Sequence, residues 1–203
     1  MPGPTMQFWQ EQFEQGRTPW DRGGVNPQLD DWLASGALSP CRILVPGCGS
    51  GYEVVALAQA GFDVTGLDYA PVAIARTRKA VDAAVAKVSL IEADVLAWQH
   101  VRSFDAIYEQ TCLCALHPDH WRAYADQLWY WLRPHGHLFA LFVQFLRPSV
   151  ADGSIAGPPY HCDITAMRAL FFEPRWVWPK PPYPRTTHPA GLDEVAVVLQ
   201  RRD

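Results

Sequence analysis

The chain has 203 residues, a length that suits one α/β domain with its own hydrophobic core. Hydrophobic residues make up 49% of it and charged residues 19%, a balance that favours a globular fold over long disorder. The net charge of −4 gives no basic surface for nucleic acid, and no apolar run reaches the roughly 18 residues that a membrane-spanning helix needs.

The first residues contain no basic segment followed by an apolar run, so no signal peptide is predicted. The cysteines number five, which is odd, and most lie inside apolar segments. This pattern favours reduced thiols in a cytoplasmic protein over a disulfide framework. Cys112 and Cys114 are spaced C-x-C, but no second pair completes a tetrahedral zinc site, so no metal site is predicted.

The N-terminal segment, residues 1–35, is predicted to hold two helices before the main fold begins. The first covers Met6 to Gln15 and stops at Gly16. The loop RTPWDRGGVNP then leads to a second helix from about Pro27 to Ala34.

Strands and helices alternate along residues 41–203, which form the core of the predicted domain. Helices are expected over 51–60, ended by Gly61, then from Pro71 onward, and along PDHWRAYADQLWYWLRPHG. The alternation predicts one domain, 1–203, of the α/β class, with a Rossmann-like, doubly wound and mainly parallel sheet. The first five predicted strands are CRILVP, FDVTGLD, KVSLIEAD, SFDAIYEQ and GHLFALFVQF.

A loop of about fifteen residues that contains GPPY follows the fifth strand, and its length suggests a function. A helix over 164–171 and a final pair of strands ending in DEVAVVLQ complete the predicted fold. Sheets of this kind bind ligands beyond the carboxyl ends of their strands, so the residues at those ends are the candidates for a site.

The first strand ends in the turn LVPGCGSG, in which Gly47, Gly49 and Gly51 have the spacing G-x-G-x-G. Glycines let the backbone turn sharply and let a ligand approach without a Cβ in the way. Asp68 ends the second strand, where a carboxylate can accept hydrogen bonds from both hydroxyls of a ribose. These residues fit a nicotinamide cofactor and S-adenosylmethionine about equally.

Two further strand ends place polar groups at the same edge of the predicted sheet. Asp94 and Val95 follow the third strand, where a carboxylate beside a backbone N–H would recognise adenine. The fourth strand ends in Glu109 and Gln110. The joint placement of a ribose acid, an adenine acid and a polar fourth strand end favours S-adenosylmethionine.

Motifs over nearly the whole chain carry a family resemblance: FWQEQFEQGRTPWDRGG, LVPGCGSGYEVVALA, GLDYAP, EADVLAW, CALHPDHW, LRPHGHLFALF and GPPYHCD. Together they resemble the thiopurine S-methyltransferase family, and more closely its halide/thiol methyltransferase branch. The resemblance implies a class I S-adenosylmethionine-dependent methyltransferase, with a seven-stranded sheet and an N-terminal helical lid. It also accounts for Pro46, since VPGCG is typical of this family and the last residue of a strand need not donate to the ladder.

The resemblance implies a role for residues along the whole site. The lid would close Trp9, Phe13 and Trp20 over the cofactor, although the branch often has tryptophan in place of Phe13. Gly47 would line the methionine moiety and Asp68 would bind the ribose. The implied cofactor-binding residues are Trp9, Phe13, Trp20, Gly47, Gly49, Asp68, Tyr69, Asp94, Val95, Glu109 and Gln110.

The residues predicted to orient the substrate are Gln110 and Tyr160 of the GPPY motif, with His161 as a further candidate. Glu109 and Gln110 would lie near the reactive end of the cofactor. Thiopurine enzymes carry arginine at the position of Gln110, and many plant halide enzymes carry tyrosine. An arginine there could pair with an anionic substrate or with the cofactor carboxylate, whereas glutamine hydrogen-bonds only as a neutral group.

The sequence therefore predicts a cytoplasmic methyltransferase that transfers the methyl group of S-adenosylmethionine to a small soft nucleophile: a thiol, hydrosulfide, halide or thiopurine. Its partners would be a small-molecule substrate, with no nucleic acid and no membrane, and it would be a monomer or a weak homodimer. Two alternatives stay open: a nicotinamide-dependent oxidoreductase, and a cofactor-binding protein without turnover.

Overall fold

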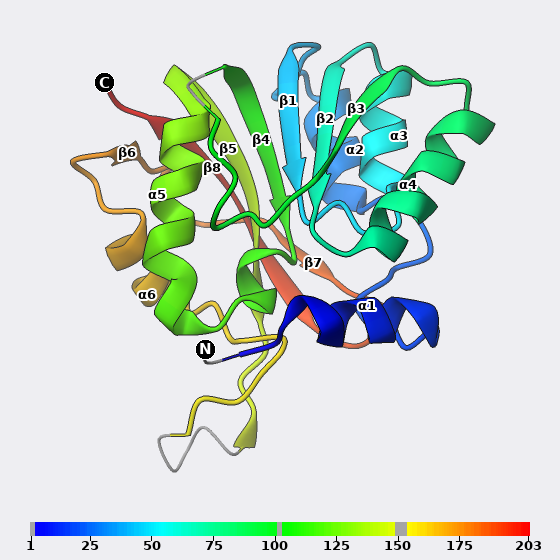
Figure 1. Ribbon diagram of the computed structural model, residues 1–203. Coiled ribbons are helices and arrows are strands. Elements are labelled where there is room, and N and C mark those ends of the chain that lie inside the picture. Colours follow the sequence, from blue (N-terminus) through cyan, green and yellow to red (C-terminus); the bar gives the residue numbers. More distant parts are fainter. Residues whose placement is uncertain (1–2, 101–102, 149–153) are drawn as a thin grey trace.

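The computed structural model describes residues 3–100, 103–148 and 154–203, which form one sheet flanked by helices (Figure 1). The sheet has the strand order β3-β2-β1-β4-β5-β8-β6, and β7 also pairs with β8. The pairings among β1 to β5 are parallel, whereas β8 runs antiparallel to its neighbours. The strands are β1 (Arg42–Pro46), β2 (Asp63–Asp68), β3 (Val88–Glu92), β4 (Phe104–Gln110), β5 (Leu132–Gln144), β6 (Trp176–Val177), β7 (Arg185–Thr187) and β8 (Asp193–Arg201).

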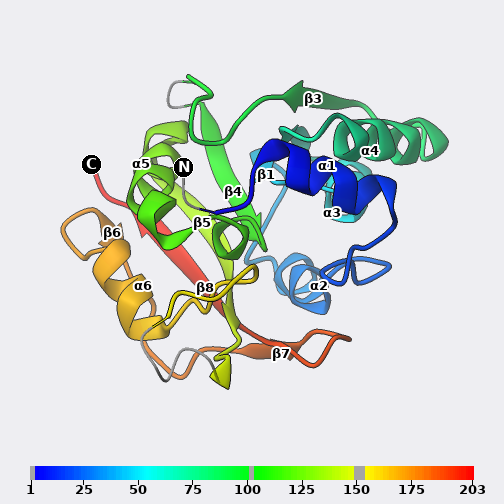
Figure 2. The same cartoon turned by 60° about the horizontal axis from the view of Figure 1, so that its bottom comes forward.

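Helices cover both faces of the sheet, which confirms the predicted fold class. Figure 2 shows α5 and α6 on one side of the sheet and α2, α3 and α4 on the other. Each side encloses its own cluster of buried side chains, with Leu128 and Trp131 of α5 in one and Leu29 and Leu57 in the other. The helices are α1 (Met6–Glu14), α2 (Pro27–Ala34), α3 (Tyr52–Gln59), α4 (Pro71–Ala83), α5 (Trp121–Trp131) and α6 (Ile164–Leu170), with short 3₁₀ turns η1 (Leu113–Ala115) and η2 (Pro118–His120).

The predicted N-terminal helices are present almost as expected. The side chain of Thr5 accepts a hydrogen bond from the backbone N–H of Phe8 and caps α1, and Asn26 caps α2 in the same way. Figure 1 shows α1 lying across the carboxyl ends of the parallel strands. The Oε1 atom of Gln10 accepts a hydrogen bond of 3.1 Å from the backbone N–H of Val72, which joins α1 to the first turn of α4.

Two details differ from the sequence prediction. Helix α5 ends at Trp131 and β5 begins at Leu132, several residues early, because Pro134 disfavours helical backbone at the residue before it. The expected final pair of strands is three strands, and the sheet contains eight rather than seven in the described chain. The outer edge of β8 is divided between β7 and β6, which pair near its opposite ends.

All five cysteines are free thiols, as predicted. No helix in the described part of the chain combines the length and the apolar character needed to cross a membrane. Residues 149–153 of the long loop after β5 lie outside the described residues, whereas its GPPY motif lies within them.

Candidate active site

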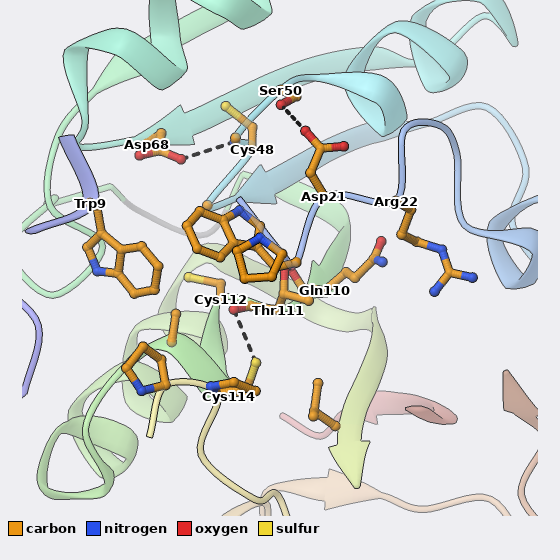
Figure 3. Close-up of a pocket in the computed structure, with 18 of the residues that line it drawn as sticks. Trp9, Asp21, Arg22, Cys48, Ser50, Asp68, Gln110, Thr111, Cys112 and Cys114 are labelled. Atoms are coloured by element: carbon orange, nitrogen blue, oxygen red, sulfur yellow. Dashed lines mark hydrogen bonds between the residues drawn. The ribbon is translucent and has the colours of Figure 1, made fainter. Parts of the chain in front are cut away.

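A cavity of about 520 Å³ lies at the carboxyl ends of the parallel strands, between the sheet and the N-terminal segment (Figure 3). This is the edge at which a doubly wound sheet is expected to bind its ligand. Most of the predicted site residues line this one cavity: Trp9, Phe13, Trp20, Gly47, Gly49, Asp68, Tyr69, Asp94, Val95 and Gln110.

The glycine turn after β1 depends on backbone conformations that other residues rarely adopt. Gly47, Gly49 and Gly51 have φ angles of +64°, +53° and +82°. A Cβ atom at Gly47 would lie 3.1 Å from the sulfur of Cys112, and one at Gly51 would lie 2.8 Å from Cγ2 of Thr77. Glycine therefore leaves room for the turn to pack closely, and it keeps backbone groups accessible at the cavity floor.

Asp68 connects the end of β2 to this turn. Its Oδ2 atom accepts a hydrogen bond of 3.1 Å from the backbone N–H of Gly49, and Oδ1 accepts one of 3.0 Å from Ala70. The side chain is 8% exposed, and burial raises the pKa of its carboxyl while the backbone N–H groups lower it. Each carboxylate oxygen has a second lone pair, so Asp68 can still accept hydrogen bonds from a ligand in the cavity.

The tip of β3 supplies the next pair of residues. The Oδ1 atom of Asp94 accepts a hydrogen bond of 2.8 Å from the backbone N–H of Leu96, which fixes the loop after the strand. Asp94 is exposed and Val95 is buried, and both line the cavity. This arrangement offers a free carboxylate oxygen beside an apolar surface, as an adenine ring with its amino group requires.

An aromatic cluster from the N-terminal segment covers the cavity beside Asp68 and the first turn of α4. The ring of Trp20 packs edge-on against Trp9 and Phe13, with centroids 5.1 Å and 5.7 Å away. Arg76 of α4 donates a hydrogen bond to the backbone carbonyl of Phe13, and its guanidinium lies 5.4 Å from the centre of that ring. The three rings therefore form an apolar cover that is fixed by ring packing and by Arg76.

The structure corrects the prediction for Glu109, whose side chain is absent from the cavity wall. Neighbouring residues on a strand point to opposite faces, so Gln110 and Tyr108 share one face and Glu109 the other. The hydroxyl of Tyr108 donates a hydrogen bond of 2.8 Å to Gln110. Glu109 instead accepts one of 2.6 Å from the backbone N–H of Leu113, and burial raises the pKa of its carboxyl to about 7.

The structure also corrects the prediction for Tyr160, which does not line the cavity. Its backbone N–H donates a hydrogen bond of 2.7 Å to the carbonyl of Cys114, and its ring lies edge-on to His117 at 5.4 Å. The prolines before it, Pro158 and Pro159, line the cavity instead. Tyr160 therefore packs behind the wall that the GPPY motif forms.

Two of the three cysteines that line the cavity are Cys112, which lies close to Gly47, and Cys114. Burial raises the pKa of both thiols well above the ordinary value, and the nearby carboxyl of Glu109 raises them further. The thiol of Cys114 donates a hydrogen bond of 3.3 Å to the carbonyl of Thr111. Both sulfurs are therefore held as neutral thiols, which are poor nucleophiles compared with thiolates.

A set of charged residues at one end of the cavity was missed by the sequence prediction. Arg22, Glu53 and Glu194 all line the cavity, and the guanidinium of Arg22 lies 3.3 Å from the carboxylate of Glu194. Burial raises the pKa of Glu53 to about 7. The motif FWQEQFEQGRTPWDRGG pointed to the segment that holds Arg22, but no sequence signal placed Glu194 beside it.

The cavity fits an elongated ligand with a nucleoside at one end. Asp68, Asp94 and Val95 form an end with acceptors and an apolar surface, and the glycine turn leaves open floor in the middle. The aromatic cover packs beside the glycine turn and Ala70, and the charged residues lie at the other end. In the described residues, no group of three or more histidine, cysteine, aspartate and glutamate side chains could hold a metal ion.

Comparison with known proteins gives the same picture. The family model described as Thiopurine S-methyltransferase (TPMT) matches residues 4–178. Probable thiol methyltransferase 2 of Arabidopsis thaliana is 35% identical over 159 residues, which cover 77% of this chain and 68% of that protein. Thiocyanate methyltransferase 1 of the same plant is 31% identical over 164 residues, which cover 80% and 70%.

A similar solved structure is that of Burkholderia thailandensis 1,6-didemethyltoxoflavin-N1-methyltransferase with bound 1,6-didemethyltoxoflavin and S-adenosylhomocysteine. The match has a TM-score of 0.76 and 18% sequence identity, and it covers 98% of this chain and 87% of that one. At this identity the likeness shows a shared fold.

Proposed function

Because the chain belongs to the thiopurine S-methyltransferase family, it is an S-adenosylmethionine-dependent methyltransferase, and we propose that it methylates a small soft nucleophile. The acceptors that we propose are a thiol, hydrosulfide, a halide or a thiopurine. The family assignment decides against the alternative of a nicotinamide-dependent oxidoreductase. The monomeric or weakly dimeric state and the cytoplasmic location remain predictions.

One observation carries the proposal: the glycine turn, Asp68 and the aromatic cluster meet in a single cavity whose wall is mostly apolar. Two relatives are named for thiol and thiocyanate methylation, and both acceptors are soft nucleophiles. The polar residue at the tip of β4, Gln110, is neutral. A largely apolar wall with a neutral residue at the tip of β4 supports an acceptor that reacts through sulfur or halide, because such an acceptor needs little hydrogen bonding.

The residues of the cavity bind each part of the methyl donor. We assign Asp68 to the ribose hydroxyls, and Asp94 with Val95 to adenine. Gly47 and Gly49 offer backbone along the middle of the donor, and Tyr69 closes the wall beside Asp68. S-adenosylmethionine supplies an electrophilic methyl group on a sulfonium. A nucleophile would bond to that methyl carbon in line, and S-adenosylhomocysteine would leave with the electron pair of the broken carbon–sulfur bond.

The aromatic cover keeps water out of the reacting part of the cavity. Trp9, Phe13 and Trp20 are the residues we assign to this role, and faces of aromatic rings also favour a nearby cation such as a sulfonium. A general base is not required for a thiol acceptor, because a few per cent of a thiol is thiolate near neutral pH and the thiolate is very nucleophilic. The neutral thiols of Cys112 and Cys114 do not compete with such an acceptor.

Gln110 is the residue that we assign to orienting the acceptor. It lines the cavity, and its side chain is held by the hydrogen bond from Tyr108. Tyr160 would act on the acceptor only through Pro158 and Pro159, which it supports from behind. We therefore place Tyr160 in the wall and not at the reacting atoms.

The test is methyl transfer from labelled S-adenosylmethionine to a panel of acceptors: hydrosulfide, 2-mercaptoethanol, thiocyanate, iodide and a thiopurine. Carboxylates such as acetate and benzoate serve as hard-nucleophile controls of similar size. We expect volatile or extractable methylated product from sulfur or halide acceptors and none from the carboxylates. Methylation of carboxylates alone, or cofactor binding without transfer to any acceptor, would overturn the proposal.

A further inference from the structure

The cavity has two chemically different ends, and Figure 3 shows Asp68 and Arg22 on opposite sides of it. Asp68 is the acceptor for a ribose, as argued above. The methyl donor carries its amino acid group, with an α-carboxylate and an α-ammonium, at the end remote from adenine. A donor that places its nucleoside near Asp68 therefore directs the amino acid group toward the side of the cavity where Arg22 lies.

Arg22 is a buried cation held in a fixed place. Its side chain is 9% exposed, and its NH1 group donates a hydrogen bond of 3.3 Å to Oε2 of Glu194. Its NH2 group donates one of 3.1 Å to the backbone carbonyl of Thr187. A guanidinium has five N–H groups in a planar fork, so these two contacts leave further donors for a ligand.

Arg22 belongs to the same wall as Gln110. Both residues line the cavity, and Gln110 accepts its hydrogen bond from Tyr108. Burial raises the pKa of the Tyr108 hydroxyl, and the positive charge of Arg22 lowers it. The wall of the cavity therefore carries a positive charge at Arg22 as well as a neutral amide at Gln110.

We propose that Arg22 binds the α-carboxylate of S-adenosylmethionine, and that Glu194 orients its guanidinium for this contact. The cation reaches the carboxylate from the N-terminal segment, so the neutral Gln110 on β4 is free to face the acceptor. This inference rests on the methyl donor and is independent of which acceptor is methylated.

The charges at this end of the cavity favour a zwitterion over a simple anion. Glu194 is 1% exposed and already pairs with Arg22, and Asn26 donates a further hydrogen bond of 2.8 Å to it. The charges of Arg22 and Glu194 already cancel, so a lone anionic acceptor at Arg22 would leave one negative charge uncompensated in a buried place, which is costly. The amino acid group of the donor adds no net charge, because its ammonium accompanies its carboxylate toward Glu53 and Glu194.

Isothermal titration of the full chain with two ligands tests the proposal. S-adenosylhomocysteine keeps the amino acid group, whereas 5′-methylthioadenosine has the nucleoside and sulfur without it. Arg22→Gln should weaken the binding of S-adenosylhomocysteine by roughly 10- to 100-fold, because a charge-assisted hydrogen bond is lost. The affinity for 5′-methylthioadenosine should stay within about twofold of that of the natural chain. Arg17→Gln is the matched control, since Arg17 is an exposed arginine of the same N-terminal segment and should change neither affinity.

Three outcomes overturn the inference. Equal weakening of both ligands by Arg22→Gln means that Arg22 only holds the N-terminal segment in place. Unchanged affinity for both ligands means that the carboxylate binds elsewhere. Unchanged cofactor affinity with a raised KM for an anionic acceptor assigns Arg22 to the acceptor.

Arg22→Lys extends the test if the glutamine variant fails to fold. Lysine keeps the charge and loses the planar fork, so S-adenosylhomocysteine should bind several-fold more weakly while 5′-methylthioadenosine is unaffected. Loss of affinity for both ligands to the same extent would contradict the proposal here too.

Discussion

The end of the cavity around Asp68 is built from three consecutive strand tips. The end around Arg22 joins the N-terminal segment to β8, which lies far along the chain. At the first end, the turn at residues 47–51 hydrogen-bonds to Asp68 only 19 residues away. At the second end, Arg22 contacts Glu194 across a separation of 172 residues. One end is thus local in sequence and the other is not.

The two ends of the cavity are held together by different kinds of interaction. The local end is fixed by backbone conformation, because its glycines and the carboxylate of Asp68 bind one another through main-chain groups. The distant end is held by side chains that meet only once the sheet has formed. They form an ion pair and enclose buried carboxyl groups. The local end should therefore be sensitive to an added Cβ, and the distant end to charge and pH.

The largest effect is expected for Gly51→Ala in the local end. The change forces a left-handed φ of +82° on alanine and brings its Cβ to 2.8 Å from Thr77, so we expect a loss of roughly 2–5 kcal/mol in the free energy of unfolding. Urea denaturation measures that loss, and titration with S-adenosylhomocysteine measures the accompanying fall in affinity.

Gly36→Ala is the matched control for this change. Gly36 has a similar φ of +72°, but an added Cβ there would meet no atom within 4 Å. The Gly36→Ala variant should lose only about 1–2 kcal/mol in the free energy of unfolding and keep full cofactor affinity. Equal losses in the two variants would show that crowding against Thr77 is unimportant.

A pH-dependent effect is expected for Glu109→Gln, on the face of β4 that points away from the cavity. Burial raises the pKa of this carboxyl from 4.5 to about 7 in the folded chain, so the folded state holds a proton that the unfolded state has lost between those values. Stability therefore falls as pH rises through this window, and the full cost of roughly 3 kcal/mol is present above pH 7. Glutamine has no such cost, so the variant should gain stability relative to the natural chain between pH 5 and pH 8.

The measurement is urea denaturation of both proteins across that pH range. Glu92→Gln is the control, because Glu92 is exposed at the end of β3. A plot of the unfolding free energy of Glu92→Gln against pH should run parallel to that of the natural chain. A parallel curve for Glu109→Gln as well would mean that Glu109 is not protonated in the fold near neutral pH.

The smallest effect is expected for Asp68→Ala, and it concerns ligand affinity. The change removes the acceptor for the ribose hydroxyls, so S-adenosylhomocysteine should bind roughly 1–3 kcal/mol more weakly. Asp63→Ala on the same strand is a control, since the side chain of Asp63 is 75% exposed and lies outside the cavity. If calorimetry finds no loss of affinity in Asp68→Ala, Asp68 does not bind the ribose.

The sequence predicted the local end well because its signals are local. The glycine spacing, the acid at the end of β2 and the acid after β3 lie in segments whose strand and helix types follow from hydrophobic pattern and turn residues. The helices over residues 6–14 and 27–34 were likewise predicted from residues that lie at their own ends. The structure places these candidates along one cavity.

The distant end could not be predicted in the same way. Glu109 and Gln110 are neighbours at the tip of β4, and only the packing on the two faces of the sheet decided that Glu109 is enclosed and Gln110 reaches the cavity. The GPPY motif was recognised, but its prolines form the wall and Tyr160 lies behind them.

The sequence by itself determined the order of the strands and helices, the glycine turn and the acid that faces it, because each depends on residues close together along the chain. Only the tertiary structure decided which side chains share the cavity and that Arg22 meets Glu194. Such contacts follow from the twist of the sheet and from which strand lies beside which, and local sequence patterns carry no record of either.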